Sequence, residues 1–549
     1  MKKLLFLLTL LMLAMVCEPA LAQQNKPKDQ KEKEKEKERG KSVKQLTKSF
    51  IDYIGKNNSQ TSNLAQKRSS RPATVTRDSI SAEDENSFED EFESFRKRSF
   101  REFENFRDEA NAEYAKFMEQ AWKVFDSSPA KPQPEEKDVP PVEVKDDDQK
   151  PANDNSIAVK EMVAPPVPEP QPVPIAPVPA QDSTAQVKTF TCFGTQMGVH
   201  FSDDLSFWLP ALNEKNVAKV WTTLASKEYN NLIRDCLQLR VDYQLSDWAY
   251  LNMLFQMAKA CMGDSNEATL LAAFVYCQSG YKMRLAFANN HLRLLYASKH
   301  FIYGQSYFYI DNDYYYPFNG GGEEQMQVCE ASFPQEKPLS LWITTSQKFA
   351  MSPTKELQFQ SRRYEDVQAK VSVNKNLIDF YETYPTSSLG ENFMTRWSMY
   401  ANTPLDVSLK EQLYPVLREE LKGYSELEAV ERLLNWVQTG FVYEYDEQVW
   451  GHDRAFFAEE TIYYPSCDCE DRSILLSRLV RDLLGLKTVL VYYPGHLALA
   501  VRFNEDVKGD FLTLNGNRFV VCDPTYINAR VGRTMPGLDN SEATVIMLE

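Results

Sequence analysis

A proline-rich segment in the first third of the chain sets the strongest limit on what can fold. Residues 129–179 contain 14 prolines, including the run APPVPEPQPVPIAPVP. Proline has no backbone N–H and fixes φ near −65°, so such a run favours an extended polyproline conformation over a packed core. We therefore interpret residues 127–186 as a disordered, proline-rich linker and expect folded domains after it.

Two further segments precede this linker. Residues 23–84 are polar and contain KEKEKEKERGK, whose alternating charges predict a solvated, disordered arm. Residues 85–126 predict one amphipathic helix, because apolar residues recur at steps of three and four. The stripe contains Phe88, Phe92, Phe95, Phe103, Phe106, Ala110, Phe117, Ala121 and Val124. It either packs on the protein's own body, or binds a partner or a second copy of the chain.

The first 22 residues are typical of a cleaved secretory signal peptide. Two lysines precede an apolar run from Leu4 to Val16, and an Ala-Leu-Ala site ends at Ala22. Cys17 offers a lesser alternative, a lipid anchor. No later apolar run reaches the roughly 18 residues that cross a bilayer. We therefore expect an extracytoplasmic protein, periplasmic or secreted, without a transmembrane span.

Composition excludes one class of partner and leaves the cysteines open. The formal charge of −16 argues against nucleic-acid binding, which needs a concentrated basic face. Export would allow disulfides to persist, but eight cysteines in so long a mature chain do not make a disulfide scaffold. Most are expected to be small buried residues, so a catalytic cysteine must be justified by its neighbours. No cofactor or metal is expected.

Folded sequence resumes near residue 187. Residues 187–335 predict an α+β domain, with helices at 247–262 and 266–278 followed by the strands YKMRLAF, HLRLLYA and SYFYID. Residues 336–403 alternate apolar and polar side chains and predict a small β-rich connecting region. Residues 404–549 predict the last domain, in which the helix SELEAVERLLNWVQTG leads to the strand FVYEY.

The segment SCDCEDRSILLSRLVRDLLG places a cysteine at the start of a helix. Asp468 is an expected N-cap with Asp471 at the third helical position, and Gly485 ends the helix. Cys469 then lies in the first turn, where unpaired N–H groups and the helix dipole favour a thiolate. The carboxylates of Glu470 and Asp471 act in the opposite sense, so the nucleophile requires a base.

Two later motifs supply a base and an acid. KTVLVYYPGHLALAVRF predicts two strands joined at Pro494-Gly495, with His496 opening the second. FLTLNGNRFVVCDPTY predicts a hairpin whose second strand ends at Asp523. Cys469, His496 and Asp523 follow one another at intervals of 27 residues. A thiolate, an imidazole and an orienting carboxylate are the groups that acyl transfer from an amide requires.

In these motifs the chain resembles the transglutaminase-like superfamily. DCEDRSILLSRLVRDLLGL, GHLALAV and VCDPTY are similar to that family's Cys, His and Asp motifs, over roughly residues 404–549. The resemblance implies a papain-like core with an antiparallel sheet, the nucleophile at Cys469, the base at His496 and the orienting acid at Asp523. It implies a cysteine peptidase or acyltransferase whose substrate is a protein, a peptidoglycan peptide or a small amide. The family's oxyanion-stabilising side chain has only candidates here, namely Gln438, Tyr443 and Tyr445.

Other readings stay open at this point. Cys467, Cys469, His496 and Cys522 are of the types that bind zinc, although C-x-C is shorter than the usual knuckle spacing. Cys467 or Cys522 could also pair in a disulfide. The same fold also hosts inactive members, so a catalytically silent envelope scaffold or protein-binding module is the alternative function.

The middle domain has the same order of sequence motifs as the last one. NEATLLAAFVYCQSGYKMRLAFANNHLRLLY aligns with CEDRSILLSRLVRDLLGLKTVLVYYPGHLALAV, and both contain a glycine 11 residues before a histidine. The alignment sets Asn266 against Cys469 and His291 against His496. If this reflects homology rather than chance, residues 187–335 are a degenerate second copy that lacks the nucleophile.

Overall fold

The computed structural model describes residues 82–135, 139–144, 154–164, 167, 170–181, 185–319 and 325–549. The signal peptide, Cys17 and the charged arm up to residue 81 lie outside the described residues. Residues 94–549 belong to one compact unit, and the contacts below are within it. No described helix has the length and apolar character needed to cross a membrane.

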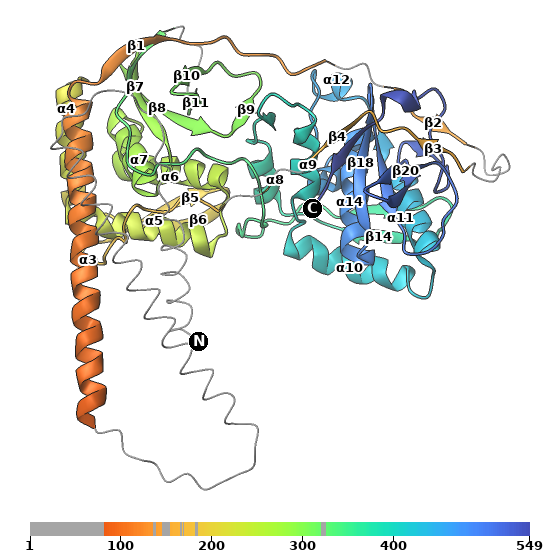
Figure 1. Cartoon of the computed structure of the whole chain (residues 1–549), viewed down its shortest axis with the longest axis horizontal. Helices are drawn as coiled ribbons and strands as arrows, with labels where there is room; N and C mark the ends of the chain where they lie inside the picture. Colours follow the sequence, from red (N-terminus) through yellow and green to blue (C-terminus); the bar gives the residue numbers. More distant parts are fainter. Residues whose placement is uncertain are drawn as a thin grey trace. The chain divides into compact units, whose positions relative to one another are not determined.

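The described residues form twelve α-helices and predominantly antiparallel sheets (Figure 1). The helices are α3 (Ala82–Met118), α4 (Glu214–Leu224), α5 (Asn230–Asp242), α6 (Asp247–Met262), α7 (Asn266–Gln278), α8 (Lys375–Tyr381), α9 (Thr395–Asn402), α10 (Val407–Glu420), α11 (Glu426–Gly440), α12 (Asp446–Val449), α13 (Ala458–Tyr463) and α14 (Cys469–Leu484). The prediction of a mixed α and β fold with an antiparallel sheet is confirmed.

A seven-stranded sheet forms the centre of the C-terminal region. Its order is β3-β20-β21-β19-β18-β23-β4, and only the two outermost pairs are parallel. The strands are β3 (Ser156–Ile157), β4 (Glu161–Val163), β18 (Lys487–Tyr493), β19 (His496–Arg502), β20 (Phe511–Leu514), β21 (Asn517–Cys522) and β23 (Thr544–Met547). Helix α14 packs on β18 and β19, and α11 packs on α14. This arrangement brings the start of α14 to the start of β19.

The middle region contains a six-stranded antiparallel sheet in the order β1-β12-β7-β8-β11-β10. Its strands are β1 (Trp122–Asp126), β7 (Met283–Ala288), β8 (His291–Ser298), β10 (Phe308–Ile310), β11 (Asp313–Pro317) and β12 (Gln325–Cys329). Helix α7 packs on β7 and β8, and α6 packs on α7. The predicted helices at 247–262 and 266–278 are confirmed, with Ser246 and Ser265 accepting hydrogen bonds as N-caps.

The two sheets have the same connectivity. In each, a helix leads into an antiparallel pair of strands, a hairpin adds to the second strand, and a later strand returns to the first. The matched sets are α7, β7, β8, β10, β11, β12 and α14, β18, β19, β20, β21, β23. A histidine opens the second strand in both, at His291 and His496. The shared topology supports the interpretation of residues 187–335 as a second copy.

The prediction of a disordered linker at 127–186 is wrong for its described parts. Strands β3 and β4 extend the C-terminal sheet, and β2 (Val142–Glu143) pairs with β22 (Tyr526–Ile527). Ile157 and Val163 are buried in the core. Isolated apolar residues between prolines have no periodicity of their own, but a sheet edge offers them backbone partners and an apolar surface.

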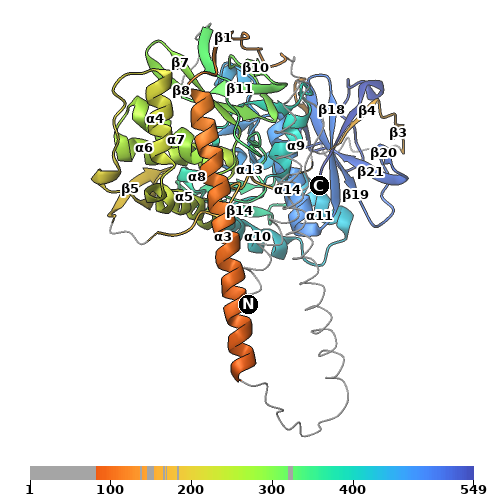
Figure 2. The same cartoon turned by 60° about the vertical axis from the view of Figure 1, so that its left-hand side comes forward.

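The aromatic helix is also shorter than predicted and docks by a different face. Helix α3 ends at Met118, and residues 122–126 form β1 instead (Figure 2). Phe103, Phe106 and Phe117 are exposed. The buried face carries Arg107, Ala110, Asn111, Tyr114, Ala115 and Met118.

Hydrogen bonds explain why polar residues of α3 lie inside. Arg107 donates to Asn230 at 2.7 Å, and the amide of Asn111 bonds Gln278 and accepts from the indole of Trp221 at 3.1 Å. Buried polar groups are tolerated when each finds such a partner. Among the described side chains of α3, the phenylalanines of the stripe thus lie outside the docked face, and Ala110 lies on it.

The connecting region is less regular than predicted. Residues 336–403 contain helices α8 and α9 together with short strands β13 (Leu357–Gln360), β14 (Gln368–Val371) and β15 (Ser387–Leu389). Asn374 caps α8, whose apolar residues at 377, 378, 380 and 381 are buried. The alternation of apolar and polar residues predicted strands here. The segment forms a helix instead, because burying this short apolar face against the rest of the protein stabilises it.

Candidate active site

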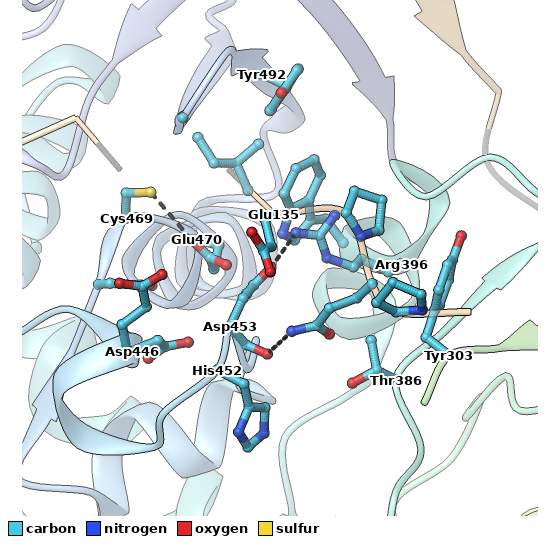
Figure 3. Close-up of a pocket in the computed structure, with 18 of the residues that line it drawn as sticks. Glu135, Tyr303, Thr386, Arg396, Asp446, His452, Asp453, Cys469, Glu470 and Tyr492 are labelled. Carbon is cyan, nitrogen blue, oxygen red and sulfur yellow. Dashed lines mark hydrogen bonds and ion pairs between the residues drawn. The ribbon is translucent and has the colours of Figure 1, made fainter. Parts of the chain in front are cut away.

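A cavity of about 470 Å³ lies at the start of α14. Three C-terminal elements line it: the first turn of α14 with Cys469, the β18–β19 turn with His496, and the loop that carries Asp453. Arg396 and Trp397 of α9 complete its polar wall, and residues of the middle region and of the proline-rich segment also line it (Figure 3). The cavity therefore joins segments that are far apart in the sequence.

Cys469 is the first residue of α14, as predicted. Asp468 has extended backbone angles, and its N–H donates to the Asp471 carboxylate at 3.2 Å. Gly485 ends the helix in the left-handed conformation with φ of 69°. The cap holds the first turn so that the sulfur of Cys469 faces the cavity wall formed by β19.

The environment of Cys469 favours the neutral thiol. Burial, followed by the neighbouring carboxyls of Glu470 and Asp468, raises its pKa well above the ordinary value for cysteine, and a hydrogen bond from the Leu497 backbone N–H lowers it by less. The thiol donates to Glu470 Oε2 at 3.3 Å. A helix N-terminus contributes at most about 2 kcal/mol to an anion, less than the cost of burying one. The dipole alone therefore does not make a thiolate here.

His496 and Asp523 form a buried pair. His496 Nε2 lies 2.9 Å from Asp523 Oδ2, and both side chains are almost wholly inaccessible to solvent. The other oxygen of Asp523 accepts from the N–H groups of Thr525 at 2.9 Å and Tyr526 at 3.2 Å. The carboxylate is thus held from both sides and fixes the imidazole with the proton on Nε2.

The second ring nitrogen of His496 is left for another group. Nδ1 is buried and has no hydrogen-bond partner among the described residues. A buried polar atom without a partner is unusual in a native fold and is typical of sites where a reacting group takes its place. With Nε2 on Asp523, Nδ1 is the nitrogen that can accept a proton.

Leu497 connects Cys469 with the His496–Asp523 pair. Its N–H hydrogen-bonds to the sulfur of Cys469, and its carbonyl accepts from the Ser473 hydroxyl at 2.8 Å. Ser473 lies one helical turn after Cys469, and Leu497 directly follows His496. These two contacts clamp the first turn of α14 to the start of β19. The structure therefore places Cys469 and His496 on one cavity and pairs His496 with Asp523. The expected chain of hydrogen bonds ends at His496, because the Cys469 thiol donates to Glu470 instead.

The middle region has part of the same arrangement. Asn266, at the start of α7, accepts a hydrogen bond from the Leu292 N–H at 2.8 Å. Leu292 follows His291 as Leu497 follows His496. The registers of β8 with β11 and of β19 with β21 set Asn319 at the position of Asp523. The copy thus has an amide at each of the positions that the thiol and the carboxylate occupy in the C-terminal region.

Acidic side chains crowd the cavity beside Cys469. Carboxylate oxygens of Asp446, Asp453 and Glu470 lie within 4.8 Å of one another, and Arg396 pairs with Asp453 at 3.1 Å. Burial, and then the charge of Asp453, raise the pKa of Glu470 to about 8, against the effect of Arg396. Glu470 therefore keeps its proton to a higher pH than an ordinary carboxyl, and its Oε2 accepts a hydrogen bond from the Cys469 thiol. With Arg396 as counter-ion, we assign no metal to this group.

The zinc and disulfide readings receive no geometric support. Within the described part of the chain, the groups of His, Cys, Asp and Glu close enough to share an ion do not combine Cys467, Cys469, His496 and Cys522. All eight described cysteines are free thiols. Cys467 instead donates to the Val442 carbonyl and Cys522 to that of Val520.

Sequence reasoning missed Trp397. Its indole lines the cavity, contacts the Tyr492 ring in a tilted arrangement with 5.2 Å between the centroids, and lies 3.7 Å from the Arg396 guanidinium. The buried Nε1 has no hydrogen-bond partner among the described residues. Of the predicted oxyanion candidates Gln438, Tyr443 and Tyr445, none lines the cavity, and Gln438 donates to three backbone carbonyls. No local signal marks Trp397, because it lies 72 residues before Cys469 in a different segment.

Comparisons with protein-family models, curated proteins and solved structures found no match for this chain.

Proposed function

We propose that the C-terminal region is a transglutaminase-like cysteine enzyme that acts on amide bonds, by peptide hydrolysis or by acyl transfer. In this proposal Cys469 is the nucleophile, His496 the general base and acid, and Asp523 the group that orients the imidazole. One observation carries it: the buried His496–Asp523 pair leaves Nδ1 without a partner beside the clamped Cys469. The α14, β19 and β21 arrangement also fits the papain-like core that the motifs imply.

The reaction follows from these groups. Nδ1 takes the thiol proton while Sγ attacks the amide carbonyl carbon. As the tetrahedral intermediate collapses, the C–N bond breaks and the imidazolium gives its proton to the departing amine, which leaves an acyl thioester. Water or a second amine, deprotonated by the same nitrogen, then displaces the sulfur. The product is a carboxylic acid or a new amide, and the thiol regains its proton.

Transfer of the thiol proton to His496 also explains how Cys469 can react although its pKa is raised. The thiol does not have to be ionised at rest, because proton transfer and attack can occur together once the thiol turns from Glu470 to Nδ1 of His496. The indole N–H of Trp397 lines the cavity without a partner among the described residues, so it can donate to developing negative charge. Asp523 stabilises the imidazolium that forms.

A catalytically silent binding module is the second candidate. The neutral, buried thiol and the amides in the middle copy favour it. Alkylation of Cys469 by iodoacetamide, followed by peptide mass spectrometry, separates the two. The enzyme proposal expects His496→Ala to slow alkylation of Cys469 at pH 7 by at least tenfold while Cys261, the only half-buried one among the described cysteines, is unaffected. Equal rates in the two proteins would favour the silent module.

The reaction itself needs a direct assay. A peptide library incubated with the wild-type chain and with Cys469→Ala should give products, read by mass spectrometry, in the first sample alone. The amine portion leaves in both reactions, so the acyl fragment distinguishes them: a free carboxylic acid, with one water gained, indicates hydrolysis, and an amide that carries the added amine indicates transfer.

A further inference from the structure

Part of the proline-rich segment crosses the candidate active site. Residues 128–135, which we name the strap, run from the middle region to the cavity, where Pro132, Gln133, Pro134 and Glu135 form part of its wall with Cys469 and His496 (Figure 3). The Gly304 N–H donates to the Lys131 carbonyl at 2.9 Å, and the Gln133 amide donates to the Asp453 carbonyl at 2.6 Å. A segment of the chain itself therefore occupies the approach to the thiol.

Both sides of the strap are anchored firmly. On its N-terminal side, β1 pairs along its whole length with β12, and Ser128, the first residue of the strap, exchanges two backbone hydrogen bonds with Tyr307. After it, the Val139 N–H donates to the Gly495 carbonyl at 2.9 Å, next to His496. Val139, Val142 and Val144 then pack on a small core around Tyr526.

The strap itself is held weakly. Lys131, Pro132, Pro134 and Glu135 are exposed, and Gln133 is half-buried. The ion pair of Lys131 with Glu391 is solvent-exposed on both sides and adds little. Elsewhere in the same proline-rich segment, Ile157, Val163, Ala176 and Val178 are buried. The part over the cavity thus differs from its flanks, since it can leave without opening the core.

We propose that this cavity is a groove for an extended, proline-containing polypeptide, and that the strap is its built-in occupant, which keeps substrate from Cys469. The inference rests on the proposed function and assigns it a substrate class. The groove presents backbone groups to the strap, namely the Gly304 N–H and the Asp453 carbonyl. The first bonds a strap carbonyl, which any extended peptide offers, and the second accepts from the Gln133 side-chain amide. It also has buried donors without partners, such as the Trp397 indole, that a peptide carbonyl can engage.

Proline suits such a groove. In the strap sequence KPQP, each proline fixes its own φ and restricts the residue before it to extended conformations. The peptide is therefore already in the shape that the groove takes, and little conformational entropy is lost on binding. A tethered segment also has a high effective concentration, so a free substrate must bind more tightly than the strap does to displace it.

The test compares two chains that differ only in the strap. One carries P132S, Q133G and P134S, which removes the rigid extended sequence and the Gln133 contact. The matched control carries P140S and P141S, two proline-to-serine changes at residues that do not line the cavity. In the full-length protein, the first variant should show alkylation of Cys469 by iodoacetamide at least about tenfold faster than wild type, with a larger effect for a bulky maleimide. The control should match wild type.

A synthetic peptide of residues 128–135 then probes the groove. Added in excess to the strap variant, it should return Cys469 alkylation toward the wild-type rate, and a peptide with alanine in place of Pro132 and Pro134 should protect less. Wild-type rates in the strap variant would show that the strap does not guard the thiol. Faster alkylation that no peptide slows would mean that the strap only covers a site for a small molecule. This result would overturn the proposal that the groove binds a polypeptide.

The outcome is separable from that of the proposed function. Fluorescence anisotropy of the labelled peptide on the strap variant reports groove binding without chemistry. If the peptide binds and protects while His496→Ala leaves alkylation unchanged in the strap variant, the groove stands and the enzyme proposal fails.

Discussion

Replacing Glu470 with glutamine is expected to lower the pH at which Cys469 becomes reactive. The thiol lies 3.3 Å from Glu470 Oε2. The pKa of this carboxyl is raised to about 8, and burial raises the pKa of the thiol well above its ordinary value, so both groups lose their protons only in alkaline solution. Whichever loses its proton first opposes ionisation of the other. The two therefore titrate as a pair, and the reactive thiolate forms only after the repulsion has been overcome.

The size of this repulsion follows from the distance. Two unit charges 3.3 Å apart interact by about 5 kcal/mol at an effective dielectric constant of about 20. At about 1.36 kcal/mol per pKa unit, this is an upper limit of nearly 4 units. Burial and the Asp468 carboxyl still act on Cys469 in Glu470→Gln, so we expect the midpoint to fall by at least about one unit.

The assay is the rate of Cys469 alkylation by iodoacetamide between pH 6 and 10, in chains that keep the strap, with intact-protein melting as a check on folding. Glu470→Asp is the matched control, because it keeps the charge while withdrawing the carboxyl by one methylene, and its profile should stay close to that of wild type. Superimposable profiles for the glutamine variant and wild type would show that burial alone sets the reactivity of the thiol, and would refute the reasoning.

Three further outcomes are expected. Asp523→Asn should slow Cys469 alkylation at pH 7 by at least about tenfold, because the imidazolium loses its counter-charge and the tautomer is no longer fixed; an unchanged rate would argue against a working triad. Trp397→Phe keeps the ring against Tyr492 but removes the unpaired N–H, so it should lower kcat/KM on a cleaved peptide about tenfold with the alkylation rate unchanged. Burial, above all, raises the pKa of Glu459 to about 8 in the folded chain. Its protonated form therefore stabilises the fold fully below about pH 4.5 and this contribution is lost as the pH rises through 8. Calorimetry should show Tm falling from pH 6 to 9 in wild type and falling less in Glu459→Gln; parallel curves would contradict it.

Local signals in the sequence were sufficient for the helix and strands that carry the site. Asp468 and Gly485 mark the two ends of α14, and the Pro494-Gly495 turn sets the register that puts His496 at the first position of β19. Each signal acts within a few residues of the element it controls. For that reason the positions of Cys469, His496 and Asp523 could be predicted with their structural context.

Residues that depend on distant partners could not be predicted in the same way. Ile157 and Val163 form strands only because β20 and β23 present edges to them. In α3, periodicity counted the phenylalanines as the packing face, whereas Arg107 and Asn111 are buried because Asn230, Gln278 and Trp221 supply hydrogen bonds from other elements. Trp397 lines the cavity because α9 packs on α14, and no spacing in the sequence predicts that packing.

The middle and C-terminal regions share one topology, and comparing them indicates which features of the site are structural and which are chemical. In both, a backbone N–H just after the strand-opening histidine holds the side chain at the start of the preceding helix, Asn266 in one and Cys469 in the other. This contact therefore belongs to the packing of helix on sheet and does not by itself make a nucleophile. What distinguishes the C-terminal copy is the burial of the imidazole: His496 is inaccessible and paired with Asp523, whereas His291 is exposed. Restoring chemistry to the middle copy would require burying and orienting its histidine, so introducing a thiol at Asn266 alone should not create a second reactive site.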